Sequence, residues 1–303
     1  MTLLAPDLVR DALVALDDEP APTVLAGGTD LMVGVNYGRR RLDDVLSLRR
    51  LDELRRWRVE PGEDGDRGGL AQVVLGAATT YTALLAPGPS ELLPALAQAA
   101  RTVGSPQIRN TGTIGGNLAT GSPAGDTLPV LVAHGASVEL ASRSGRRTLP
   151  VADFLLGPKR TALRPGELLT AVRVPVVTGP GEFLKIGVRN AMVIAVANCA
   201  LVLDTARHRV RCALGSVGPV PVSDSTVEGW ASDRLDWDGG GPLDPALAAE
   251  FGRRMSAVSR PIDDHRATAD YRRRAVGVLA TRALERAWHA TTGDRRARPG
   301  EAA

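Results

Sequence analysis

Two segments with paired glycines limit what this chain can fold into. The first consists of Ala26, Gly27, Gly28, Thr29 and Asp30 and directly follows an apolar stretch, Thr23 to Ala26, that predicts a short buried strand. Paired glycines permit positive φ and remove Cβ atoms, so several backbone N–H groups can converge on an anion. Taken alone, a Gly-Gly pair after a strand is more often a plain turn.

The second segment consists of Thr113, Ile114, Gly115, Gly116 and Asn117, and Ser122 to Asp126 follows it before a predicted helix. Asp126 could accept hydrogen bonds from sugar hydroxyls or an adenine amine, or simply interact with the dipole at the helix start. Two donor-rich turns can hold the two ends of one pyrophosphate, which favours a dinucleotide ligand. Neither segment is a Rossmann GxGxxG or a Walker P-loop, so a different dinucleotide-binding fold is indicated.

Composition excludes several other classes of protein. A chain of 303 residues, 44% apolar and 23% charged, is long enough for two soluble domains, and no apolar run could span a membrane. The start lacks a signal peptide, so we expect a cytoplasmic protein. Basic residues are mixed with acidic ones despite a net charge of +3, so nucleic-acid binding is not expected. The two cysteines and four histidines have no spacing typical of a metal site or hydrolytic triad, so we expect neither a metal nor a catalytic residue.

Hydrophobic periodicity and breaker residues predict the elements of the first half of the chain. Gly62 to Gly69 is expected to be a hairpin loop, and Gly104 to Ser122 a long irregular stretch. The next helix is expected to start at Pro123, after a Ser122 cap, and to stop at Gly135. The other predicted helices and strands are Asp7 to Leu16, Ala71 to Gly76, Glu91 to Val103, a hairpin of Ala136 to Ala141 with Arg147 to Pro150, and Leu168 to Val174.

The second half predicts an antiparallel sheet followed by two helices. A boundary is placed at Pro175. In the last helix, Val276 to Ala287 carries an apolar stripe, whereas Arg272 to Arg274 are expected to form a solvated or subunit-facing surface. The apolar segments assigned to the sheet are Phe183 to Val188, Val193 to Leu203, Val210 to Val217 and Thr226 to Trp230.

The sequence AGGTDL at 26–31 and TIGGNLATGSPAGD at 113–126 together resemble the FAD subunit of the carbon monoxide dehydrogenase and xanthine dehydrogenase family. The resemblance runs from about residue 6 to 290. Further matches are Gln107 to Asn110, Glu167 to Leu169 before Val174-Pro175, Lys185 with Arg189, and Ala269 to Arg272.

The resemblance implies an α+β fold: a two-lobed, PCMH-type (vanillyl-alcohol-oxidase-like) FAD-binding domain at 1–174, with lobes at about 1–54 and 55–174. A CO dehydrogenase flavoprotein C-terminal domain of antiparallel sheet and helices would follow at 175–290, and a disordered tail at 291–303. Ala26 to Asp30 and Thr113 to Asn117 would hold the pyrophosphate of FAD, and Asp126 the ribose or adenine side. Leu169 and Lys185 would approach the isoalloxazine, although a lysine in a strand is ordinarily a solvated charge.

The function implied is that of an electron-transfer subunit in a molybdenum hydroxylase complex. Electrons would come from a molybdopterin-containing large subunit through a small [2Fe–2S] subunit and leave to NAD, a quinone or oxygen. One alternative is a stand-alone flavoenzyme of the same fold that acts directly on a small molecule. The other is a non-enzymatic scaffold with an empty pocket.

Overall fold

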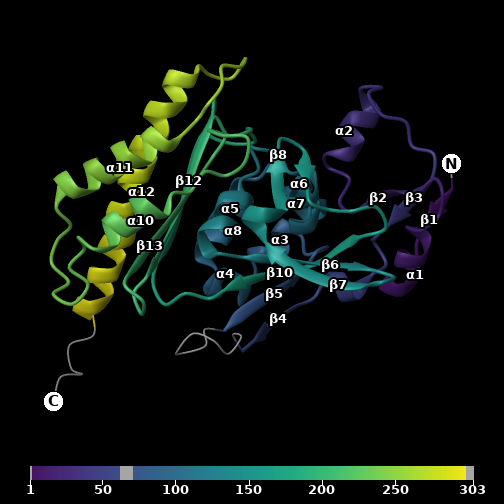
Figure 1. The fold of residues 1–303 in the computed structure, drawn as a ribbon, viewed down its shortest axis with the longest axis horizontal. Helices are drawn as coiled ribbons and strands as arrows, with labels where there is room; N and C mark the ends of the chain where they lie inside the picture. Colours follow the sequence, from purple (N-terminus) through teal and green to yellow (C-terminus); the bar gives the residue numbers. More distant parts are fainter. Residues whose placement is uncertain (1, 62–70, 298–303) are drawn as a thin grey trace.

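The computed structural model describes residues 2–61 and 71–297 and has the predicted α+β architecture (Figure 1). At the N-terminal end lies a parallel sheet of order β1-β3-β2, formed by Leu3–Leu4, Val45–Ser47 and Thr23–Leu25. Helix α1 (Val9–Ala15) covers it and buries Val9, Ala12 and Leu13 against Leu46 and its neighbours. Helix α2 (Leu31–Asn36), which follows the first glycine segment, buries none of its own residues.

A five-stranded antiparallel sheet of order β4-β5-β10-β6-β7 forms the second layer. A group of short helices packs on it and shares its largest apolar core. The strands are β4 (Trp57–Glu60), β5 (Gln72–Gly76), β10 (Leu168–Pro175), β6 (Ser137–Ser142) and β7 (Gly145–Pro150). The helices are α3 (Tyr81–Leu84), α4 (Pro89–Leu92), α5 (Pro94–Thr102), α6 (Pro106–Thr111), α7 (Ile114–Thr120), α8 (Thr127–His134) and α9 (Val151–Phe154), with a 3-10 turn at Asp52–Leu54 and a small hairpin of β8 (Leu155–Gly157) and β9 (Arg160–Thr161).

The third layer is an antiparallel sheet of β11 (Gly181–Ile186), β12 (Ala197–Asp204) and β13 (Arg209–Gly215). One face packs on α5 and α8, and the other carries α10 (Ser225–Ser232), α11 (Pro245–Val258) and α12 (Ala269–Ala297) (Figure 1). Because both faces are covered, all eight residues of β12 are buried. The sheet therefore lies between the apolar core of the five-stranded sheet and the apolar core of the C-terminal helices.

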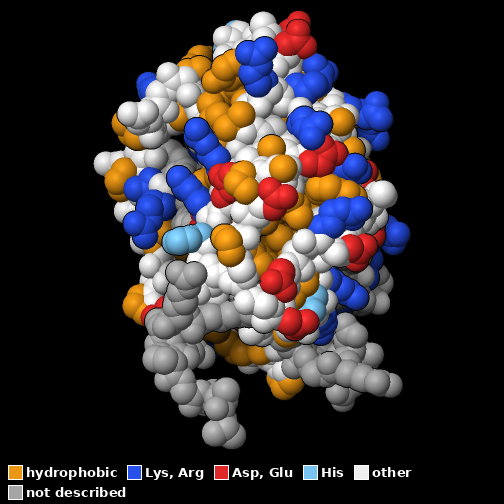
Figure 2. All heavy atoms as spheres, turned by 90° about the vertical axis from the view of Figure 1, so that its left-hand side faces the viewer, with side chains coloured by type: hydrophobic (Ala, Val, Ile, Leu, Met, Phe, Trp, Pro, Cys, Tyr) orange, Lys and Arg blue, Asp and Glu red, His pale blue; other side chains and the backbone are white. Residues whose placement is uncertain are grey.

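The outer face of the C-terminal helices carries both signs of charge. Figure 2 shows arginine and lysine side chains interspersed with aspartate and glutamate on this side of the molecule. On α11, for example, Glu250 pairs with both Arg253 and Arg254. No helix among residues 2–61 and 71–297 is long and apolar enough to cross a membrane.

Most predicted elements form, but four expectations are wrong. The stretch 104–122 is not irregular, because Ser105 and Thr113 cap α6 and α7. Helix α8 begins at Thr127 rather than Pro123, although it ends at Gly135 as predicted. Residues 226–230 belong to helix α10 rather than a strand, because the Asp224 side chain caps the N–H groups of Thr226 and Val227. The helix predicted at 91–103 is broken before Pro94.

Two further expectations concern the less regular ends of elements. Strand β2 forms, but Val24 is exposed, so the strand is not a buried one. Helix α12 continues to Ala297, so a disordered tail does not begin at residue 291. The hairpin loop expected at 62–69 and the end of the tail, 298–303, lie outside the described residues.

Candidate functional site

A cavity of about 630 Å³ opens between the N-terminal three-stranded sheet with the segment after β2, the helices on the five-stranded sheet and the loop that joins β11 to β12. Both glycine segments line it. Its volume lies within the roughly 300–1,000 Å³ range of sites for small molecules and cofactors. The two segments predicted to act together, far apart in the sequence, therefore share one cavity.

The first glycine segment forms an open turn whose donors are unused. Gly28 adopts φ +71°, a conformation that glycine reaches without the steric cost of a Cβ atom. Among the hydrogen bonds of the described residues, none uses the N–H of Gly27, Gly28, Thr29 or Asp30. A row of free amides on a cavity wall is a site for an anion.

Gly27 explains why the two segments lie side by side. A Cβ atom built on Gly27 would lie 1.9 Å from the carbonyl oxygen of Thr111, at the end of α6. The first turn therefore packs directly on the backbone that leads into the second segment. A Cβ on Gly116 would similarly lie 3.9 Å from that of Ala26.

The second glycine segment is the first turn of helix α7, and it is not an open turn. Thr113 caps the helix by accepting a hydrogen bond of 3.0 Å from the N–H of Gly116, and the N–H of Gly115 donates to the Ala77 carbonyl at 2.9 Å. The interpretation that these two N–H groups converge on an anion is therefore wrong, because partners within the chain already use them. Gly115 instead allows close packing, since its Cβ would lie 2.5 Å from the Ala77 oxygen.

Asn117 is held in place by the start of the next helix. Its Oδ1 accepts a hydrogen bond of 2.6 Å from the hydroxyl of Thr127. Its Nδ2 group has no acceptor among the described residues and belongs to a residue that lines the cavity. Asn117 can therefore still donate to a ligand, and so can the free amides of the first segment.

Asp126 and Lys185 are joined in a buried ion pair. The Lys185 ammonium lies 2.5 Å from Oδ2 of Asp126, and their side chains are only 8% and 5% exposed. Thr102 and Asn198 also donate to the carboxylate, at 3.0 Å and 3.2 Å. Burial raises the pKa of Asp126, and Lys185 opposes that rise. The expectation that these two side chains serve opposite ends of FAD is therefore wrong, because two groups in contact can reach only one part of a ligand.

The structure places Lys159, and not Lys185, on the cavity wall. Lys159 lies in the turn between β8 and β9, where its N–H donates to the Gly121 carbonyl at 2.9 Å. Its side chain is exposed and has no ion-pair partner among the described residues. The signal was available, since Lys159 is one of only two lysines in the chain.

Tyr81 is a second lining residue that the sequence did not single out. It begins helix α3 and is buried, and its hydroxyl has no hydrogen-bond partner among the described residues. Burial, and then the charge of Asp126, raise the pKa of Tyr81 well above its ordinary value. The phenol therefore remains a neutral donor beside the Asp126 carboxylate. Tyr81 follows Thr80, which forms a β-bridge with Thr113. This pairing between distant residues brings Tyr81 to the cavity and is not visible in the sequence.

Apolar side chains complete the cavity. Leu169 at the start of β10, a residue that the family resemblance placed near the cofactor, and Val103 at the end of α5 both line it. Val193 and Ile194, from the loop between β11 and β12, form another apolar part of the wall. Ile194 is 60% exposed, so this wall borders solvent.

Residues 1–177 match the family model described as the FAD binding domain in molybdopterin dehydrogenase, and residues 182–287 match the CO dehydrogenase flavoprotein C-terminal domain. The chain belongs to this flavoprotein family. As a member of the family it is an oxidoreductase subunit with FAD as its cofactor.

Relatives support the assignment of this flavoprotein over nearly its full length. The carbon monoxide dehydrogenase medium chain of Afipia carboxidovorans is 33% identical, covering 93% of this chain and 94% of that protein. A putative xanthine dehydrogenase FAD-binding subunit of Escherichia coli is 29% identical, covering 94% and 95%. A solved carbon monoxide dehydrogenase structure from Hydrogenophaga pseudoflava superimposes with a TM-score of 0.81 and 30% identity, covering 96% and 98%.

Proposed function

We propose that this flavoprotein carries electrons between the [2Fe–2S] clusters of a small partner subunit and an external acceptor, within a complex that also contains a molybdopterin-containing large subunit. The acceptor is NAD, a quinone or oxygen. Bound FAD supplies the ability to take up electrons singly and return them in pairs. The residues of this chain bind the cofactor and position it.

The row of free N–H groups from Gly27 to Asp30 in the cavity carries the proposal. A pyrophosphate is a dianion, and Lys159 and Arg40 are cavity-lining cations without an ion-pair partner among the described residues. We assign the pyrophosphate to the first glycine segment and these cations. Thr113 to Asn117 would form the adjacent wall, with Asn117 as its donor.

The remaining contacts follow from the cavity lining. Asp126, supported by Lys185, and Tyr81 would contact one polar part of the cofactor together, and Leu169 would pack on a ring. We further propose that residues 1–174 form the FAD-binding domain, in lobes of about 1–54 and 55–174. Residues 175–290 would then form a C-terminal domain that closes one side of the cavity through Val193 and Ile194.

The cofactor assignment is tested on the purified chain. We expect a yellow protein that releases FAD on denaturation, and apoprotein that takes up added FAD. Gly28→Val should abolish retention, because a β-branched side chain cannot adopt φ +71° readily and would crowd the free amides. Normal FAD content in this variant would show that the residue assignment is wrong.

The electron-carrying role needs a separate test. The proposed [2Fe–2S] partner subunit would be reduced with dithionite, freed of excess reductant and mixed anaerobically with the oxidised flavoprotein. We expect loss of the flavin absorbance near 450 nm and its return on addition of NAD, a quinone or oxygen. If the flavin stays oxidised, and the chain alone turns over an organic substrate, it is a stand-alone flavoenzyme instead.

A further inference from the structure

Arg272 is a buried arginine in the first turn of helix α12, so the expectation that it belongs to a solvated or subunit-facing surface is wrong. It is only 2% exposed. Its Nε is buried and has no hydrogen-bond partner within residues 2–61 and 71–297. An apolar side chain of similar volume would fill this position without the desolvation of a charge, so packing alone does not explain an arginine here.

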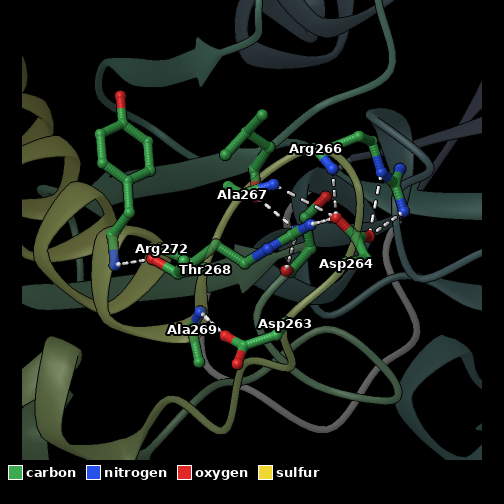
Figure 3. A network of polar contacts seen from close by, with 10 residues as sticks. Asp263, Asp264, Arg266, Ala267, Thr268, Ala269 and Arg272 are labelled. Carbon is green, nitrogen blue, oxygen red and sulfur yellow. Dashed lines mark hydrogen bonds and ion pairs between the residues drawn. The ribbon is translucent and has the colours of Figure 1, made fainter.

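The guanidinium of Arg272 joins three segments of the C-terminal region (Figure 3). Its Nη1 donates to the carbonyl oxygens of Val196, at 2.8 Å, and Ser216, at 3.0 Å. Its Nη2 donates to Oδ1 of Asp264 at 2.6 Å. The three acceptors lie just before β12, just after β13, and in the loop before α12.

Asp264, which accepts a hydrogen bond from Arg272, is itself fixed by further hydrogen bonds. Its other carboxylate oxygen accepts hydrogen bonds from the Arg266 side chain at 2.7 Å and 3.0 Å, as the dashed lines of Figure 3 show. Burial acts to raise the pKa of Asp264, but the hydrogen bonds from Arg266 and Arg272 hold it well below the ordinary value. The carboxylate therefore stays ionised and fixes the orientation of the Arg272 guanidinium.

The Val196 carbonyl connects this network to the apolar wall of the cavity. Val196 lies two residues beyond Ile194, and its N–H donates to the Ile186 carbonyl at 2.8 Å. Arg189 donates to the carbonyls of Ala191 and Met192 at the other end of the same loop. Arg272 thus holds the end of this loop next to β12, whereas Arg189 stabilises the turn within the loop that carries Val193 and Ile194.

The Ser216 carbonyl connects the network to the polar wall. Ser216 has φ +63°, which is uncommon for a residue other than glycine, and its N–H donates to the Pro123 carbonyl at 2.9 Å. Pro123 belongs to the segment 122–126 that carries Asp126 into the cavity. One guanidinium therefore fixes the carbonyls next to two separate walls of the site.

We propose that Arg272, oriented by Asp264, is a positioning residue for the cofactor: it sets the spacing between the 193–194 loop and the 122–126 segment that FAD must fill. This inference rests on the proposed placement of FAD in the cavity. Arg272 touches neither the cofactor nor the reacting atoms and acts through the backbone at Val196 and Ser216.

The test replaces Arg272 in the full chain by lysine, which keeps the charge but cannot bond both carbonyls and Asp264 at once. The matched control is Arg273→Met at the neighbouring position, where the Arg273 side chain forms an ion pair with the exposed Asp270. We expect Arg272→Lys to lower the affinity of the apoprotein for FAD about tenfold. An effect of this size is typical of mutations that act on a site through intervening contacts. The circular dichroism of the bound flavin should also change, while the control matches wild type in both.

The outcomes separate this inference from the proposed function. If wild type and Arg273→Met bind FAD and folded Arg272→Lys binds it with equal affinity and an unchanged flavin spectrum, the positioning role is overturned and the cofactor site stands. If wild type binds no FAD, the proposed function fails and this inference fails with it.

If Arg272→Lys does not fold, hydrogen exchange of the wild-type protein decides. FAD should slow exchange of the N–H groups of Val196 and Ser216, because the cofactor and Arg272 restrain the same two walls. Unchanged exchange at both positions would overturn the inference.

Discussion

Lys185→Met tests whether the buried ion pair with Asp126 holds the fold or acts on the cofactor. The substitution keeps the length of the side chain and removes its charge. The Asp126 carboxylate would remain 5% exposed and would lose the ammonium that lies 2.5 Å away. Thr102 and Asn198 would still donate to it, but neither carries a charge.

The expected loss of stability follows from this geometry. Removing one partner of a buried ion pair leaves an uncompensated charge and typically costs about 3–5 kcal/mol. Replacing both partners by uncharged groups is often neutral, so Asp126→Asn combined with Lys185→Met should recover most of the free energy of unfolding. We therefore expect a large loss in the free energy of unfolding in the single variant and a small loss in the double variant.

The pH dependence has a definite sign. Burial already raises the pKa of Asp126 above 3.8, and replacing Lys185 removes the positive charge that opposes that rise. The folded variant would then hold a proton at pH values where the unfolded carboxyl has lost it. Its stability should increase as the pH falls toward 3.8, with a limiting slope of about 1.4 kcal/mol per pH unit.

The assay is urea unfolding of apoprotein and of FAD-saturated protein, since ligand binding itself adds stability. The other lysine provides the control. Lys159→Met should change apoprotein stability by less than about 0.5 kcal/mol, as is usual for an exposed site. It should weaken FAD binding about tenfold or more, because a hydrogen bond to a charged group contributes roughly 1.5–3 kcal/mol.

The reverse pattern would refute the reasoning. If Lys185→Met loses FAD while the apoprotein keeps wild-type stability at neutral pH, the ammonium acts on the cofactor and the ion pair is not a structural one. A double variant as unstable as the single variant would also show that the loss does not come from an unpaired carboxylate.

Two further variants test other parts of the structure. Gly27→Ala places a methyl group 1.9 Å from the Thr111 oxygen, so the purified protein should contain much less FAD than Gly34→Ala, whose nearest neighbour lies 3.8 Å away; equal FAD contents would contradict the packing argument. Burial lowers the pKa of His134 from 6.5 to about 4, so wild-type stability should fall as the pH drops through this interval, by up to about 1.4 kcal/mol per pH unit. In His134→Gln the urea midpoint should depend less on pH over that range. A pH dependence equal to that of wild type would argue against a neutral buried histidine.

Local signals in the sequence were reliable where the chain itself sets the conformation. Gly135 ends helix α8 in the left-handed region, and the stripe from Val276 to Ala287 packs into the C-terminal core. The misassigned stretch 104–122 also had local signals, because Ser105 before Pro106 and Thr113 before Ile114 are helix caps. Its glycines concealed them, since glycine marks turns as well as close packing.

Which residues meet in the site could not be read in the same way. The sequence located both glycine segments but did not show which of their N–H groups are free to bind a ligand. In the fold, the Ala77 carbonyl and the Thr113 hydroxyl accept hydrogen bonds from the N–H groups of the second segment. Likewise, whether each lysine is paired or free depends on whether the fold brings a carboxylate into contact with its ammonium group. Such pairings form between residues far apart along the chain and follow no sequence period.

The sequence by itself determined the glycines that permit close backbone contact, the helix caps, the apolar stripes and, through these, the family and its FAD cofactor. Only the tertiary structure decided that Lys185 neutralises Asp126, that Lys159 faces the cavity and that Arg272 is buried between two of its walls. The physical reason is that φ preferences and periodicity are properties of neighbouring residues. Desolvation and charge pairing depend on what the rest of the fold brings within a few ångströms.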